Sequence, residues 1–157
     1  MNQKLRTDAE DIARSAIEAV RPDGAVKRAL AGFRPEGRVF LAAVGKAAWQ
    51  MARAAVRELP RPVDGGVVVT KYGHVLGDIP GVVCYEAGHP VPDENSFRGT
   101  EVVLDLTRNL LPTDTVLFLL SGGGSALFEQ PLIPAEELQD VTKQLLACGA
   151  DIVEMNT

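Results

Sequence analysis

The chain has 157 residues and is acidic, with a formal net charge of −5 and an isoelectric point near 5.0. Hydrophobic residues make up 46% of it and charged residues 24%, values that are ordinary for a globular domain and exclude extensive disorder. The lysines and arginines are scattered, which argues against a nucleic acid as partner because phosphate backbones need a basic face. The length fits one domain.

The sequence shows no pattern typical of export or membrane insertion. Its first dozen residues are polar and acidic, without the apolar core of a secretory signal. The longest apolar run, Val116 to Leu120, is too short to cross a bilayer. Cys84 and Cys148 lack metal-type spacing, and we interpret them as small buried residues in a reducing compartment, without a disulfide. We therefore expect a soluble cytoplasmic protein.

Helical patterns open the chain. Thr7 and Glu10 have the spacing of a capping box, which predicts that a helix begins there. Apolar residues then recur with helical spacing, at Ile12, Ala16, Ile17 and Val20. Pro22 begins a second, short helix that ends before Gly32.

Strands alternate with helices in the rest of the chain. An apolar run from residue 38 turns at Gly45 into a helix with one apolar side, made of Ala48, Met51, Ala52, Ala55, Val56 and Leu59. Strands are predicted at 66–70, 82–87 and 115–121. A helix capped by Asp93 ends before Pro112, with Val102, Val103, Leu106 and Leu110 inside, and another spans 134–148 before Gly149.

This order predicts an α/β fold with a doubly wound, mostly parallel, Rossmann-like sheet and helices on both faces, because continuous apolar strands alternate with helices. Ligands bind such sheets beyond the carboxyl ends of the strands. Four loops are expected to share that edge, namely 45–48, 70–74, 86–93 and 121–126.

The glycine tract from Ser121 to Ser125 is the clearest candidate for an anion site. Gly122, Gly123 and Gly124 allow positive φ and a nest of backbone N–H groups that approaches an anion closely. The two flanking serines add hydroxyl donors. The alternative is a flexible turn, although a tight loop after a strand rarely needs three glycines.

Three side chains on the other loops are further candidates. Lys46 is predicted in the first turn of its helix, where a cation is unfavourable unless an anion lies nearby. Lys71 follows a strand, and its alternative is a solvated lysine. His89 stands between Gly88 and Pro90 on a constrained loop, where a hydrogen bond to a neighbouring loop is the alternative to ligand binding. His74 is a weaker candidate.

Standard nucleotide-binding motifs are absent from the sequence. A Walker A loop ending at Gly45-Lys46 would need glycine where Phe40 stands, and a hydroxyl residue where Ala47 stands. A dinucleotide fingerprint starting at Gly122 would place Leu127 at its third glycine. Its acidic partner is also missing, since Asp140 falls inside a predicted helix.

Four segments together resemble glycerate 2-kinases of the MOFRL family: GKAAWQMA, VVVTKYGH, EAGHPVPDENS and LFLLSGGGSALFEQP. They occur in that family's order and with similar spacing. The resemblance implies ATP-dependent phosphorylation of D-glycerate to 2-phosphoglycerate, with Mg²⁺ or a similar metal. Members are also labelled hydroxypyruvate reductases, an NAD(P)-dependent alternative that the failed dinucleotide fingerprint does not support.

By this resemblance, Lys46 matches a catalytic lysine at an interdomain cleft, and the tract from Ser121 to Ser125 matches the glycine-rich loop of that cleft. We add Gly45, Lys71 and His89 to the predicted phosphate-binding residues. His89 also falls, with Asp93, in the family's HPVPD segment, whose individual roles we leave unassigned.

The family's proteins are well over twice as long and have a second domain that supplies an arginine and other site residues. We therefore expect residues 1–157 to be an incomplete N-terminal α/β domain that is inactive alone, with the general base and metal ligands outside it. A non-catalytic anion-binding fragment is the alternative. The sequence does not decide the oligomeric state, and a homo-oligomer stays open.

Overall fold

A computed structural model describes residues 2–155, and of Ile152 only the backbone. In chain order the elements are α1 (Gln3–Ala19), α2 (Pro22–Leu30), β1 (Val39–Val44), α3 (Ala48–Glu58), β2 (Gly65–Lys71), β3 (Val82–Ala87), α4 (Glu94–Leu106), β4 (Thr115–Leu120), α5 (Gly124–Leu127), α6 (Ala135–Cys148) and α7 (Ile152–Met155). None of the described helices combines the length and the apolar character needed to cross a membrane.

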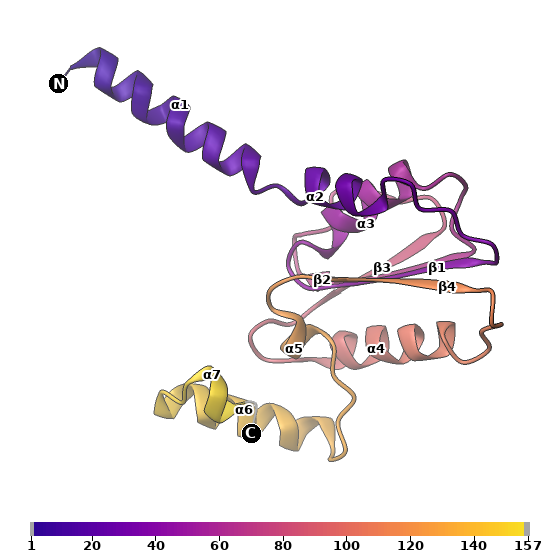
Figure 1. The fold of residues 1–157 in the computed structure, drawn as a ribbon. Helices are drawn as coiled ribbons and strands as arrows, with labels where there is room; N and C mark the ends of the chain where they lie inside the picture. Colours follow the sequence, from indigo (N-terminus) through magenta and orange to yellow (C-terminus); the bar gives the residue numbers. More distant parts are fainter. Residues whose placement is uncertain (1, 156–157) are drawn as a thin grey trace.

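The strands form one parallel sheet in the order β3-β2-β1-β4, with α2 and α3 over one face and α4 and α5 over the other (Figure 1). The predicted doubly wound α/β fold is confirmed. β1 is central and fully buried: Val39 and Leu41 face the layer of α2 and α3, and Ala42 and Val44 face the layer of α4. Burial of each of these valine or leucine side chains contributes about 1.5–3 kcal/mol.

The connections between strands place a topological switch point between β1 and β4. The chain leaves β1 through α3 on one face to reach β2, and leaves β3 through α4 on the opposite face to reach β4. After β4 the chain turns into α5 on the same face as α4, so the loops that follow the neighbouring strands β1 and β4 turn to opposite sides. Ligands of doubly wound sheets bind in the crevice that this divergence opens.

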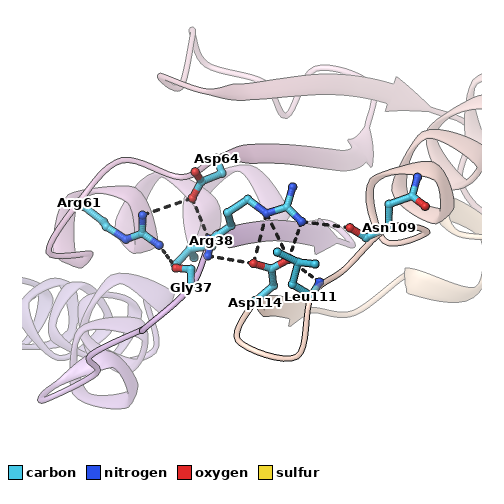
Figure 2. A network of polar contacts seen from close by, with 8 residues as sticks. Gly37, Arg38, Arg61, Asp64, Asn109, Leu111 and Asp114 are labelled. Atoms are coloured by element: carbon cyan, nitrogen blue, oxygen red, sulfur yellow. Dashed lines mark hydrogen bonds and ion pairs between the residues drawn. The ribbon is translucent and has the colours of Figure 1, made fainter.

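A polar network joins the strands at their opposite, amino-terminal ends (Figure 2). The guanidinium of Arg38 binds the carboxylate of Asp114, with an Nη2–Oδ2 distance of 2.6 Å. Asp114 also accepts hydrogen bonds from the backbone N–H groups of Arg38 at 3.0 Å and Leu111 at 2.7 Å. Next to it, Asp64 accepts from the backbone N–H of Val39 and pairs with Arg61, which also donates to the Gly37 carbonyl.

This network makes a pH-dependent contribution to stability. The hydrogen bond from Arg38, followed by that from the Leu111 backbone, lowers the pKa of Asp114 from 3.8 to about 2. Because the pKa is lower in the folded protein, the carboxylate stabilises the fold above about pH 4, and this stabilisation is lost as pH falls toward 2.

We expect Asp114→Asn to lower the Tm by several degrees at neutral pH and to flatten the loss of stability between pH 4 and pH 2, because the neutral amide keeps no charged hydrogen bond. Thermal unfolding followed by circular dichroism at several pH values measures both effects. Asp105→Asn is the matched control, since Asp105 forms only an exposed pair with Arg108. Equal Tm values for the two variants would contradict the prediction.

The start of α1 differs from the sequence prediction. Asn2 caps this helix by accepting a hydrogen bond from the backbone N–H of Lys4. The capping box at Thr7 and Glu10 is therefore wrong, because the chain is already helical one turn earlier. Thr7 instead donates to the Gln3 carbonyl, and Glu10 pairs with Arg6.

Several apolar residues expected inside lie at the surface. α1 extends away from the sheet (Figure 1) and, like α6, buries none of its described side chains. α4 ends at Leu106, so Leu110 lies beyond it and is exposed. Cys148 is exposed rather than buried, while Cys84 is half-buried; both are free thiols, as expected.

Candidate active site

The loops after β1 and β4 are hydrogen-bonded to each other at the switch point. The backbone N–H of Lys46 donates to the Gly122 carbonyl at 2.9 Å, and the N–H of Ala47 donates to Ser121 Oγ at 3.0 Å. The predicted catalytic lysine and the predicted glycine tract are thus neighbours. Ala47 occupies the N-cap position of α3, which begins at Ala48, so Lys46 lies in the loop and not in the first helical turn as predicted.

Gly45 and Ser121 build this junction. Gly45 is buried with φ +113°, and a Cβ there would lie 2.4 Å from the Ser121 carbonyl oxygen, so only glycine fits. Its N–H donates to the Val69 carbonyl, and the Ser121 hydroxyl donates to the Val44 carbonyl at 3.3 Å. Both donors are used within the protein. Gly45 and Ser121 therefore have no free donor for the phosphate contacts that the sequence predicted.

The side chains of Lys46 and His89 meet at Gly123. This glycine has φ +87°, and a Cβ on it would lie 2.8 Å from His89 Nε2 and 3.3 Å from Lys46 Cε. The positive charge of Lys71 also acts on His89, because it lowers the pKa of that imidazole. An amine and an imidazole from two different loops therefore meet at the glycine tract, and Lys71, the last residue of β2, adds positive potential at His89.

Backbone donors complete this cationic cluster, which we define as Lys46, Lys71, His89 and the tract Gly122–Ser125. Within residues 2–155, the N–H groups of the tract donate to no protein acceptor. Gly122 and Ser125 are exposed, and Gly123 and Gly124 are partly so. Unpaired N–H groups beside lysine ammonium groups are the elements of an anion-binding site.

Hydrogen bonds that sequence patterns did not predict join the other segments at this edge of the sheet. The His74 ring lies 2.8 Å from the Lys46 carbonyl oxygen through Nδ1. The Tyr72 hydroxyl donates to Asp93 Oδ2 at 2.8 Å, and Asn95 donates to the Tyr72 oxygen at 3.0 Å. Asp93 caps α4 in a capping box with Ser96, so its predicted structural role is confirmed. Sequence patterns did not indicate Tyr72 and Asn95, because their partners lie far away along the chain.

The pKa of His89 is lowered from its ordinary value of 6.5, first by burial and then by the charges of Lys46 and Lys71. The imidazole is therefore neutral at pH 7. Because protonation adds a positive charge to the cluster, it strengthens anion binding, and a bound anion favours the protonated ring in return.

We expect the affinity for sulfate to rise by roughly tenfold as pH falls from 8 to 5, the order of one added charge near a partly screened site. Sulfate stays a dianion over this range, so the change reports on the protein. Isothermal titration calorimetry measures it. The pH dependence should disappear in His89→Gln and persist in His74→Gln, and the reverse result would remove His89 from the site.

Gly123 offers a second test of the same anion site. We expect Gly123→Val to abolish sulfate binding, because a β-branched residue resists φ +87° and its Cβ would collide with His89 Nε2. Gly122→Ala is the matched control in the same tract, since its Cβ would meet only Lys46 Cε at an ordinary 3.8 Å. NMR titration with sulfate compares them. Intact binding in the valine variant would show that the tract does not hold the anion.

Of the cavities that border this cluster, two are lined by its Lys46 or its His89. One of about 270 Å³ is lined by Lys46, Trp49, Gln50 and His74. The other, of about 530 Å³, lies between the cluster and α6, where it is lined by His89, Gly123, Ser125 and Glu129. Sequence patterns predicted α6 but not its position against this loop, and Glu129 was missed.

The described residues of this site do not fit a metal ion. No group of three or more His, Cys, Asp or Glu side chains between residues 2 and 155 could hold one. Mg²⁺ takes oxygen ligands, whereas the side chains that meet at Gly123 are an amine and an imidazole.

A family model described as a domain of unknown function, DUF4147, matches residues 8–157. The chain belongs to the DUF4147 family. A D-glycerate 2-kinase from Thermotoga maritima is 54% identical over 157 residues, which cover 99% of this chain and 37% of that protein. A glycerate 2-kinase from Pyrococcus horikoshii is 45% identical over 127 residues, covering 80% of this chain and 28% of its own. A putative hydroxypyruvate reductase from Agrobacterium vitis is 40% identical over 126 residues, covering 79% and 28%.

Two solved structures are similar to this chain in fold and in sequence. The crystal structure of a glycerate kinase from Thermotoga maritima superposes with a TM-score of 0.86 at 53% identity, covering 99% of this chain and 38% of the other. The crystal structure of a protein from Pyrococcus horikoshii OT3 superposes with a TM-score of 0.81 at 38% identity, and the match covers 99% of this chain and 38% of the other. The predicted resemblance to glycerate 2-kinases is confirmed. The chain spans somewhat more than a third of the length of these two structures.

Proposed function

We propose that this DUF4147 chain forms part of the active site of a glycerate 2-kinase, which transfers the γ-phosphate of ATP to D-glycerate and releases 2-phosphoglycerate. The observation that carries the proposal is the 54% identity to a D-glycerate 2-kinase over a match that contains the whole cationic cluster. The position of this cluster at the switch point of the sheet supports it.

The cluster supplies groups that phosphoryl transfer needs. The reaction depends on positioning and on stabilising charge that spreads over the phosphoryl oxygens. In our proposal the Lys46 ammonium group donates to an oxygen of the transferring phosphoryl, and the N–H groups of Gly122–Ser125 hold the neighbouring oxygens. His89 lines the same space and offers a hydrogen-bonding ring, and Lys71 adds positive potential.

Other parts of the proposal lie outside the described residues. ATP is the phosphoryl donor and Mg²⁺ accompanies the nucleotide, but no step is assigned to a metal because these side chains do not fit one. We propose that a second domain supplies the general base and an arginine, so that residues 1–157 form an N-terminal domain without activity of its own. A homo-oligomer and a cytoplasmic location stay predictions of the sequence.

The second candidate is an NAD(P)-dependent hydroxypyruvate reductase, the activity named for the Agrobacterium vitis relative. A dinucleotide fingerprint would need glycine at Leu127, where close packing of the helix against the strand is required. Leu127 is instead a fully buried core side chain, packed in the layer that also contains Val44 and Ala87. The kinase is therefore the better supported function.

A chimaera tests the two candidates together, with these 157 residues replacing the matching region of the Thermotoga maritima D-glycerate 2-kinase. We expect enzyme-dependent formation of 2-phosphoglycerate from ATP and D-glycerate, measured by a coupled assay. In parallel, NADH and hydroxypyruvate should show no oxidation of NADH. A folded chimaera with reductase activity and no kinase activity would overturn the proposal.

A further inference from the structure

The larger cavity beside the cationic cluster has no role in the chemistry described above. Its volume is about 530 Å³, within the range of roughly 300–1,000 Å³ that is typical of small-molecule sites. α6 and α7 lie on the α4 side of the sheet (Figure 1) and give it an apolar wall made of Leu138, Val141, Leu145, Leu146 and Met155. Thr142 bonds the Leu138 carbonyl through its hydroxyl, so its donor is already used.

The opposite wall is continuous with the anion site. Gly123 and Ser125 line the cavity and belong to the glycine tract, while His89 and Pro90 extend the same wall. A ligand with phosphates on the tract would therefore place its remaining part in the cavity. Apolar walls with few polar groups suit a planar heterocyclic ring better than a second charged group.

Glu129 gives the cavity one polar group of defined character. Its carboxyl is partly buried, and burial raises its pKa. A carboxylate accepts hydrogen bonds and repels phosphate, so Glu129 favours the N–H or O–H donors of a base or ribose. The two ends of the combined site therefore differ in chemistry, cationic at the tract and acidic with apolar walls at α6.

We propose that this cavity binds the nucleoside part of a nucleoside triphosphate whose phosphates lie on Gly122–Ser125. The proposal rests on the proposed kinase function and adds to it the place of the donor nucleotide. Contacts with α6 and Glu129 then raise the affinity for a nucleoside triphosphate above that for an inorganic polyphosphate.

Binding of ATP and of inorganic tripolyphosphate to the 157-residue protein tests this placement. Tripolyphosphate carries at least as much negative charge, so charge alone does not favour ATP. We expect ATP to bind about tenfold more tightly or better, because the nucleoside buries apolar surface in the cavity. Isothermal titration calorimetry or NMR titration gives both dissociation constants in one buffer.

Two variants locate the nucleoside. Val141→Trp fills the cavity from α6 and should bring the affinity for ATP down to that for tripolyphosphate, which itself stays unchanged. Gln144→Trp is the matched control, because Gln144 is exposed on the same helix and does not line the cavity. Glu129→Gln should weaken ATP binding severalfold without weakening tripolyphosphate binding, and it carries the test if the tryptophan variant does not fold.

The outcomes separate this placement from the kinase proposal. Equal affinities of the unmodified protein for ATP and tripolyphosphate would overturn the placement alone, as would tighter ATP binding that neither cavity variant reduces. Failure of the protein to bind either probe would overturn both the placement and the role of the glycine tract.

Discussion

Replacement of Lys46 by alanine in the chimaera is expected to lower kcat by about 10²-fold or more, the order found when a charged contact to the transition state is lost. The exposed side chain of Lys46 is not part of either core layer, and its backbone N–H still donates to Gly122, so the fold and the loop remain. Steady-state kinetics with ATP and D-glycerate measure the loss. KM should change less than kcat, because the contact strengthens as charge develops.

The control for this prediction is Lys27→Ala, which removes an exposed lysine from the last turn of α2, a helix that contributes no residue to the cluster. It should leave kcat unchanged. Lys46→Arg keeps a positive charge but changes the geometry of the donors, and we expect it to recover only part of the activity. Near-normal turnover in the alanine variant would remove Lys46 from the mechanism.

The 157-residue chain alone is expected to form no 2-phosphoglycerate. Transfer between two bound substrates needs groups from both sides of the site held in place together, and we propose that a second domain supplies those of the other side. The isolated chain also exposes large apolar side chains on β4. Leu120 at the end of this strand is 62% exposed and Phe118 is 48% exposed. Such a surface favours self-association of the isolated chain.

The coupled assay with ATP, Mg²⁺ and D-glycerate decides this prediction, and the chimaera is its positive control. Size-exclusion chromatography with light scattering follows self-association in the same samples. Product formation by the isolated chain, in proportion to its concentration, would show that the cluster is sufficient. Sulfate binding by the same inactive chain would show that its anion site is formed but that further catalytic groups are needed for transfer.

Much of the fold could be predicted from local patterns. Continuous apolar strands alternating with amphipathic helices are enough to predict a parallel sheet covered on both faces, since only buried strands are apolar on both sides. The order of the loops along the chain then placed Lys46, His89 and the glycine tract at one edge of the sheet. The predicted start of α1 was wrong, because Thr7 and Glu10 have the spacing of a capping box by chance inside a helix that Asn2 caps.

Only the tertiary structure decided how the candidate residues meet. Strand order brings the loop after β4 against the loop after β1, so that the Ser121 hydroxyl is used by the backbone while the N–H groups of the tract stay unpaired. His89 reaches Gly123 from the loop after β3, and α6 returns to form the cavity with Glu129. The periodicity of apolar residues and the positions of glycines predict the conformation of each segment. The contacts between segments depend on strand order, register and hydrogen bonds between distant loops. The sequence by itself therefore determined the elements and the shared edge, and packing determined which donors and which walls face the ligand.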